Sequence, residues 1–158
     1  MADPVTSVRV RSPRTGDFKF VVALENESFA DPWEPGALEQ ELRMDSLRLP
    51  LIAELEGKVV GYLMAWKVVD QLHILNIAAD PRLRRCGVGT VLLRTAAGKA
   101  AELGLSEVTL EVRESNLEAL GFYLRHGFRQ TGLRRGYYAD DGEDAIIMTC
   151  PTADITGP

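Results

Sequence analysis

The strongest constraint on the fold lies in the second half of the chain, where two strand-like runs flank a long helical segment. The run "QLHILNIAAD" (71–80) predicts a strand ended by Pro81, and "SEVTLEV" (106–112) alternates as a second strand. Between them, "GVGTVLLRTAAGKAAELG" (87–104) has apolar residues at helical spacing and Gly104 as a stop. A strand–helix–strand unit returns the chain in the same direction, so these two strands are expected to pair in parallel.

The other segments predict an antiparallel sheet around this unit. Strands are expected at 7–12, 49–55 and 59–69, and in "FRQTGLRRGYY" and "DAIIMTC", which pair across "ADDGED". Helices are expected at 16–30, 35–43 and 115–127. The last helix carries a predicted capping box, Ser115 with Glu118. The fold class is therefore α+β, with a mostly antiparallel sheet and a parallel step near its middle.

Composition excludes several classes of protein. The chain has 158 residues, which suggests one domain, and its net charge of −5 argues against a general nucleic-acid binder. No apolar run reaches the roughly 18 residues of a membrane span, and no signal peptide is apparent, so neither a membrane nor a secreted location is expected. The two cysteines, Cys86 and Cys150, imply no disulfide framework and favour the cytoplasm. With His73 and His126 as the only histidines, no metal site is expected.

The stretch "RRCGVGT" (84–90) places glycines and positive charge at a helix entrance. The first turn of a helix offers about four unpaired backbone N–H groups, and glycines let a phosphate approach them. Arg84 and Arg85 would add charge-assisted hydrogen bonds to a pyrophosphate. The P-loop and dinucleotide patterns do not match, because Thr90 and Val91 follow Gly89 and position 92 is leucine. The alternative is a glycine-rich turn with solvated arginines.

In this setting "NIAADPRLRRCGVG" resembles the acetyl-coenzyme A signature of the GNAT acetyltransferases, Arg/Gln-x-x-Gly-x-Gly/Ala, filled by Arg84, Gly87 and Gly89. The segments "LEVRESN", "HGF", "RRGYY" and "GEDAIIM" are similar to those of the RimI-type protein N-terminal acetyltransferases, which modify the N-terminal alanine of small-subunit ribosomal protein number eighteen. The resemblance covers about residues 7–150. It implies a single GNAT domain over 7–150, with flexible termini at 1–6 and 151–158. It also implies a mixed sheet of about seven strands, helices on both faces and a splayed central parallel pair.

The resemblance also implies a set of site residues. The backbone of Ile77, Ala78 and Ala79 would hold the pantetheine of acetyl-coenzyme A, the loop would wrap its pyrophosphate, and Asn116 would contact its arm. Glu111 matches the general base and Tyr123 the general acid, while Trp33, Tyr137 and Tyr138 would border the acceptor. The predicted cofactor-binding residues are Ile77, Ala78, Ala79, Arg84, Arg85, Cys86, Gly87, Val88, Gly89, Thr90 and Asn116. The predicted partner is a protein or peptide N-terminus, that of a ribosomal protein, without nucleic acid or membrane.

Acid–base chemistry fits an N-terminal amine. An α-amino group with a pKa near 8 loses its proton at pH 7 for about 1.4 kcal/mol, whereas a lysine amine costs about 4.6 kcal/mol. One glutamate is then a sufficient base, and a tyrosine can return a proton to the leaving thiolate. The residues have structural alternatives: Glu111 as a partner of Arg113, Tyr123 as core, and Asn116 as a helix start. The acidic turn 140–144 would attract a basic N-terminus or form a solvated hairpin tip.

Three positions depart from the resemblance. Cys86 stands where relatives carry a basic or polar residue, Gly121 interrupts a helix, and Gly136 replaces a common asparagine. The last change leaves other acceptors open, namely a lysine side chain or a small-molecule amine. A third alternative is a coenzyme A-binding module without catalysis.

Overall fold

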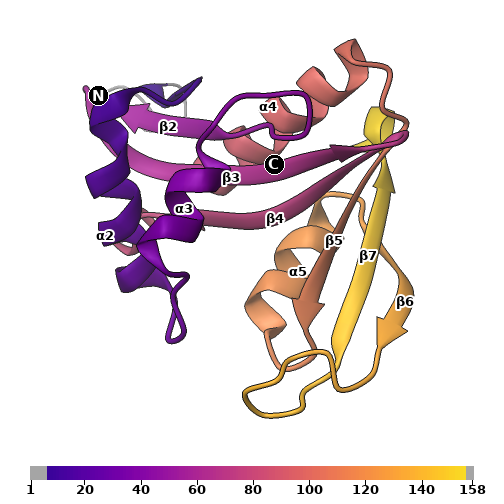
Figure 1. Ribbon diagram of the computed structural model, residues 1–158. Helices are drawn as coiled ribbons and strands as arrows, with labels where there is room; N and C mark the ends of the chain where they lie inside the picture. Colours follow the sequence, from indigo (N-terminus) through magenta and orange to yellow (C-terminus); the bar gives the residue numbers. More distant parts are fainter. Residues whose placement is uncertain (1–6, 156–158) are drawn as a thin grey trace.

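The computed structural model describes residues 7–155 as a seven-stranded mixed sheet with helices on both faces (Figure 1). The sheet order is β1-β2-β3-β4-β5-β7-β6. The strands are β1 (Arg9–Arg11), β2 (Leu51–Leu55), β3 (Lys58–Val68), β4 (Gln71–Ala79), β5 (Glu107–Arg113), β6 (Arg129–Arg134) and β7 (Ala145–Pro151). The helices are α2 (Phe18–Ser28), α3 (Pro35–Glu41), α4 (Val88–Glu102) and α5 (Leu117–Arg125), with short 3-10 turns η1 (Thr15–Asp17), η2 (Pro81–Leu83) and η3 (Thr152–Asp154). Within this part of the chain, no helix is long and apolar enough to cross a membrane.

The expected parallel step is confirmed at the centre of the sheet. β4 pairs with β5 in parallel, whereas every other neighbouring pair of strands is antiparallel. The helix α4 makes the crossover between β4 and β5, which is why they run in the same direction. The fold class predicted from the sequence is therefore confirmed.

Two apolar cores occupy the two faces of the sheet. On one face, α4 and α5 cover β3, β4 and β5 through a core that includes Leu92, Ala96, Leu110 and Phe128. On the other face, α2 and α3 pack over the middle strands, as Figure 1 shows. This smaller core consists of Val21, Leu24, Leu38, Ile52, Tyr62, Met64 and Ala78.

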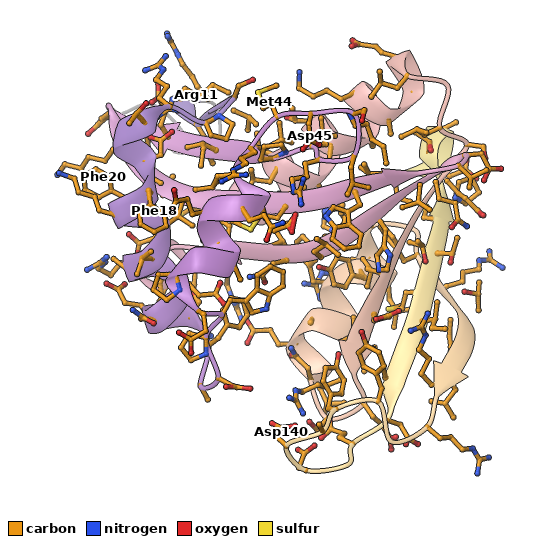
Figure 2. All side chains as sticks on the ribbon, in the orientation of Figure 1. Arg11, Phe18, Phe20, Met44, Asp45 and Asp140 are labelled. Atoms are coloured by element: carbon orange, nitrogen blue, oxygen red, sulfur yellow. The ribbon has the colours of Figure 1, made fainter. Side chains whose placement is uncertain are left out.

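An ion-paired arginine fixes the N-terminal segment to the sheet edge. Arg11 on β1 donates two hydrogen bonds of 2.8 Å to Asp17 in η1, and its Nε donates to Glu54 on β2 at 2.8 Å. Asp17 is buried, and the Arg11 guanidinium holds the pKa of that carboxyl below its usual value. Figure 2 places Arg11 at the edge of the sheet, at the opposite end of the molecule from Asp140.

Two local expectations are wrong. The predicted Ser115–Glu118 capping box does not form. Helix α5 is capped by Asn116, whose Oδ1 accepts from the N–H of Ala119 at 3.1 Å. The Ser115 hydroxyl donates to Glu143 at 2.7 Å. The tail expected to be loose from 151 onward is ordered as far as residue 155. There, the buried Thr152 donates its hydroxyl to Leu105 O at 2.8 Å. Residues 1–6 and 156–158, also expected to be flexible, lie outside the described residues.

Candidate active site

A gap opens in the sheet where β4 and β5 stop pairing. Their ladder covers Gln71–Ile74 against Glu107–Leu110, after which both strands continue without each other, and Figure 1 shows them diverging. The register of β4 against β3 shifts between Met64 and Ala65, so a bulge lies at the point of divergence. Ile77, Ala78 and Ala79 lie in the separated part of β4, where the edge facing β5 has no ladder partner.

The loop 84–90 follows the separated end of β4 and leads into the first turn of α4. Gly87 caps α4 with φ of 82° and Arg85 has φ of 62°, a strained conformation for a side chain of that size. Within residues 7–155, the N–H groups of Val88, Gly89 and Thr90 have no acceptor, because the first hydrogen bond across this turn is Val91 N to Gly87 O. Free N–H groups beside arginines fit a diphosphate, whose oxygens are negatively charged acceptors.

The two arginines that lead into the loop are mostly free to meet a ligand. Arg84 lies 3.6 Å from Glu118, and both side chains are largely exposed, so the pair is weak. Cys86 is a free thiol of intermediate exposure. The loop residues expected from the sequence therefore lie together, directly before and within the first turn of α4.

Helix α5 supports this loop from behind. A Cβ added to Gly89 would lie 3.2 Å from the Phe122 ring, so only glycine fits without displacing that ring. His126 is buried and its Nδ1 lies 2.7 Å from Phe122 O, which can only accept; in the neutral ring, Nε2 then accepts from the Thr90 hydroxyl at 3.0 Å. With its hydroxyl bonded to His126, Thr90 keeps its backbone N–H as a free donor.

Glu111 and Tyr123 lie on opposite faces of the sheet. Leu110 and Val112 point into the core under α4 and α5, so Glu111 between them points to the face that carries α2 and α3. Tyr123 belongs to the core on the α4 and α5 face, where it contacts the Phe128 ring at a centroid distance of 5.4 Å. Glu111 lies on the part of β5 beyond its ladder with β4, which ends at Leu110.

Glu111 does not pair with Arg113, the partner that its strand position suggested. Its carboxylate lies 3.4 Å from Arg134 on β6, and hydrogen bonding to Glu111 raises the pKa of Tyr137. His73 shares this face, since it pairs with Thr109; burial lowers the pKa of His73, and Glu111 opposes that shift. Arg134 and His73 were not predicted as neighbours of Glu111, because both contacts cross between strands far apart in sequence.

Tyr123 has a protonated, sheltered hydroxyl. Burial raises the pKa of this phenol far above its usual value, and the hydroxyl makes no hydrogen bond within residues 7–155. Asn116 uses Oδ1 to cap α5, and its amide N–H₂ makes no hydrogen bond within residues 7–155. At Gly121, an added Cβ would meet only the flexible end of Arg125 at 3.3 Å.

The predicted acceptor residues lie on the loop between β6 and β7 and before α3. Tyr137 and Tyr138 pack edge to face at 5.0 Å, and the Arg113 guanidinium lies 3.9 Å from the centre of the Tyr138 ring. Trp33 is half-buried and packs against the core under α2 and α3. The acidic turn is exposed at Asp140 and Asp141, and its carboxylates are paired within the protein: Asp140 and Asp141 accept from Arg113, Glu143 from Ser115, and Asp144 from Gly136 N–H.

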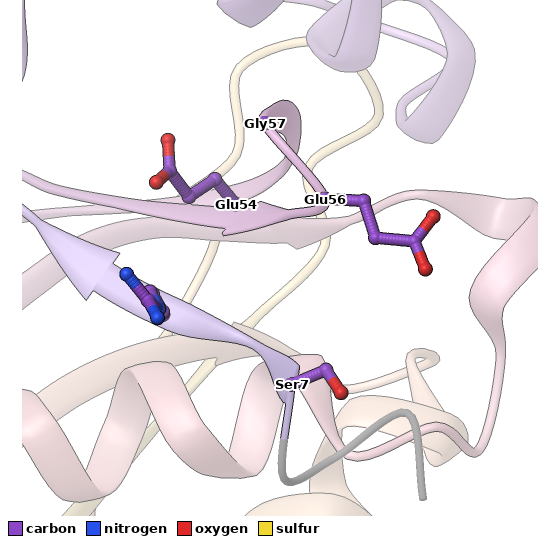
Figure 3. A pocket seen from close by; sticks show the side chains of 5 residues that line it. Ser7, Glu54, Glu56 and Gly57 are labelled. Carbon is purple, nitrogen blue, oxygen red and sulfur yellow. The ribbon is translucent and has the colours of Figure 1, made fainter. Parts of the chain in front are cut away.

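Cavities of similar size lie at two places on the surface. One of about 410 Å³ is lined by Ser7, Arg9, Glu54, Glu56 and Gly57 at the β1 edge, remote from the gap between β4 and β5 (Figure 3). The other, of about 400 Å³, lies between the end of β5 and the loop before β7, and is lined by Glu114, Ser115, Gly142, Glu143 and Asp144. Among residues 7–155, no cluster of His, Cys, Asp or Glu could hold a metal ion.

In this chain the parallel pair β4–β5 splits beside a helix start that has free N–H groups. The chain belongs to the acetyltransferase (GNAT) family of acyltransferases, whose model matches residues 18–128. A protein of Escherichia coli (strain K12) named ribosomal protein bS18-alanine N-acetyltransferase is 32% identical over 144 residues, 90% of this chain and 96% of that protein. A protein of Bacillus subtilis (strain 168) is named as a putative ribosomal protein bS18-alanine N-acetyltransferase. It is 37% identical to this chain over 143 residues, which cover 90% of this chain and 95% of that protein. A crystal structure of the Escherichia coli enzyme has a TM-score of 0.83 at 30% identity, covering 95% of this chain and 96% of that one.

Proposed function

We propose that this protein transfers an acetyl group from acetyl-coenzyme A to the N-terminal amine of a protein, with the N-terminal alanine of a small-subunit ribosomal protein as its main acceptor. The observation that carries the proposal is the gap between β4 and β5, with free helix N–H groups at its end and Glu111 and Tyr123 on its two sides. The names of the relatives from Escherichia coli and Bacillus subtilis support the choice of acceptor.

The donor would bind along β4 and the start of α4. The N–H groups of Val88, Gly89 and Thr90, with Arg84 and Arg85, would hold the diphosphate. Free backbone groups of Ile77, Ala78 and Ala79 would pair with the pantetheine arm in place of the missing strand, and one N–H can stabilise the oxyanion of the reacting carbonyl. The amide of Asn116 would bind the arm at the start of α5.

The chemistry needs one base and one acid. Glu111, on the side of the acceptor, would take the proton from the incoming ammonium, directly or through a water. Release of its carboxylate from Arg134 would accompany acceptor binding, because that ion pair otherwise competes for the proton-accepting oxygens. Tyr123, protonated at neutral pH, would donate to the leaving thiolate on the opposite face.

The acceptor would enter over the face that carries α2 and α3. Trp33, Tyr137 and Tyr138 would border it, and Arg113 fixes the loop of the two tyrosines by binding its acidic turn. A cytoplasmic site of action is consistent with Cys86 and Cys150, both free thiols.

A peptide panel with mass spectrometry tests the proposal. Peptides beginning with alanine or serine, their N-terminally blocked forms carrying an internal lysine, and polyamines are incubated with acetyl-coenzyme A. We expect acetylation of the free N-terminal peptides, and a 10²–10⁴-fold loss of kcat in Glu111→Gln, the range for loss of a general base. Acetylation of lysine or polyamine alone would reassign the acceptor, and binding of the coenzyme without turnover on any amine would indicate a non-catalytic module.

A further inference from the structure

A buried glutamate on α2 has no place in the chemistry described so far. Glu25 is 1% exposed, and it lies one residue after Leu24 and four after Val21 on the helix face that packs against the sheet. Within residues 7–155, no lysine or arginine forms an ion pair with it. A buried carboxylate without a cation costs several kcal/mol unless hydrogen bonds compensate, so this position demands specific partners.

Those partners are three donors from three separate elements. Trp33 N–H, in the turn before α3, donates to Oε2 at 2.9 Å. Asn76 Nδ2, on β4, donates to Oε1 at 2.7 Å, and the Tyr62 hydroxyl on β3 donates to the same oxygen. Burial and the bond to Glu25 raise the pKa of Tyr62, so its phenol remains the donor.

These donors lie at functionally distinct places. Asn76 follows the bulge of β4 and directly precedes Ile77, in the segment that separates from β5. Trp33 belongs to the turn proposed to border the acceptor. Glu25 therefore joins the acceptor turn to the strand along which the thioester would lie.

We propose that Glu25 is a positioning residue that holds the Trp33 turn against β4 and thereby sets affinity for the acceptor N-terminus rather than for the coenzyme. The inference rests on the proposed function, because it assumes that Trp33 contacts the acceptor. It goes beyond the proposed function because it identifies Glu25 as the residue that holds the Trp33 turn in position.

The two carboxylate oxygens of Glu25 have different partners, so a substitution can remove one set of hydrogen bonds and keep the other. In Glu25→Gln, the amide oxygen can still accept from Tyr62 and Asn76, but the amide N–H₂ would face Trp33 N–H, and two donors cannot pair. The substitution should release the Trp33 turn while leaving β3 and β4 joined. Thr152→Val, which removes one buried hydrogen bond remote from the site, serves as the matched control for lost stability.

The first measurement is hydrogen exchange at the Trp33 amide, followed by NMR, which needs no activity. We expect at least about tenfold faster exchange in Glu25→Gln, the effect of losing one hydrogen bond to a charged group, and no change in Thr152→Val. Unchanged protection of the Trp33 amide in Glu25→Gln would overturn the inference. If Glu25→Gln does not fold, Glu25→Asp, which draws the carboxylate back by one methylene, should show the same loss of protection.

The second measurement is kinetic. Glu25→Gln should raise the peptide KM about tenfold, with kcat and the Kd of the coenzyme within about twofold, and Thr152→Val should leave KM unchanged. Because Glu25 acts through Trp33, the double variant Glu25→Gln/Trp33→Ala should have the KM of Trp33→Ala alone. Additive effects would overturn the inference. If the parent enzyme acetylates no peptide at all, the proposed function fails, while the amide exchange still decides whether Glu25 anchors the turn.

Discussion

At the scale of single residues, the two ionisable side chains proposed for the chemistry lie in contrasting surroundings. Glu111 has polar and charged neighbours, including Arg134 and Tyr137, and its side chain is 13% exposed. Tyr123 has an aromatic and aliphatic environment that favours the neutral phenol. This contrast suits a base that must accept a proton and an acid that must keep one until the thiolate leaves.

Tyr123→Phe should separate catalysis from packing. The ring fills the same volume and the lost hydroxyl makes no hydrogen bond within residues 7–155, so the free energy of unfolding should change by less than about 1.5 kcal/mol. Turnover should fall by about 10²–10⁴-fold, the range for loss of a general acid, with the Kd of the coenzyme nearly unchanged. Chemical denaturation, calorimetry and steady-state rates check this. An equal loss of rate and of coenzyme affinity would assign the hydroxyl to binding.

At the scale of elements, the start of α4 depends on close packing against β3 and α5. A Cβ on Gly61 of β3 would lie 2.8 Å from Ala78 O and 2.8 Å from a Val88 methyl, and so would disturb both β4 and the first turn of α4. His126 holds the same turn from the α5 side through Thr90. The geometry of the proposed diphosphate site is therefore set by β3 and α5 as well as by its own glycines.

Gly61→Ala should destabilise the protein by about 1–3 kcal/mol, the usual cost of overpacking, and should also weaken coenzyme binding by displacing Val88. Gly98→Ala is the matched control, because this exposed glycine lies within α4 and an added Cβ meets nothing within 4 Å. The control should gain about 1 kcal/mol from helix propensity. Urea denaturation and calorimetry with the coenzyme measure both effects; a Gly61→Ala protein as stable as the parent would show that the strand shifts freely.

At the scale of the whole molecule, ion pairs as well as the two apolar cores join segments that are far apart in the sequence. Arg11 joins the N-terminal segment to β2, and Arg113 joins β5 to the loop before β7. Asp17 is the most enclosed of these carboxylates and has its pKa lowered by Arg11. Such a group stabilises the fold above the pKa that it has in the unfolded chain, and this contribution is lost as the pH falls through its lower folded-state pKa.

Asp17→Asn should therefore lower the free energy of unfolding at pH 7 by about 2–3 kcal/mol, since it weakens two charge-assisted hydrogen bonds. The difference from the parent should shrink below about pH 4, where the carboxylate of the unfolded chain becomes protonated. Urea denaturation between pH 3 and about 7 measures it, with the exposed Glu102→Gln as control. A difference that stays constant over this range would mean that Asp17 contributes through its shape rather than its charge.

The sequence by itself determined the main helices and strands, the parallel pairing of two central strands, and the position of the loop 84–90 at a helix start. Apolar spacing, proline and glycine act within a few residues, so 71–80, 87–104 and 106–112 could be assigned from local pattern alone. The loop 84–90 was correctly expected at a helix start because its glycines and charges are contiguous.

Only the tertiary structure decided which side chains face one another. Glu111 meets Arg134 rather than Arg113, and Thr90 meets His126, because sheet order and register bring together residues that no local pattern relates. Glu25 stands out in the sequence only as a charged residue on the apolar face of α2. Its hydrogen-bond donors come from a turn and two strands, which the sequence of the helix does not indicate. The periodicity of a sequence shows which face of its strand or helix a residue occupies. Which residues of other elements it meets depends on the order and register of the strands in the folded sheet, and these are set by long-range packing.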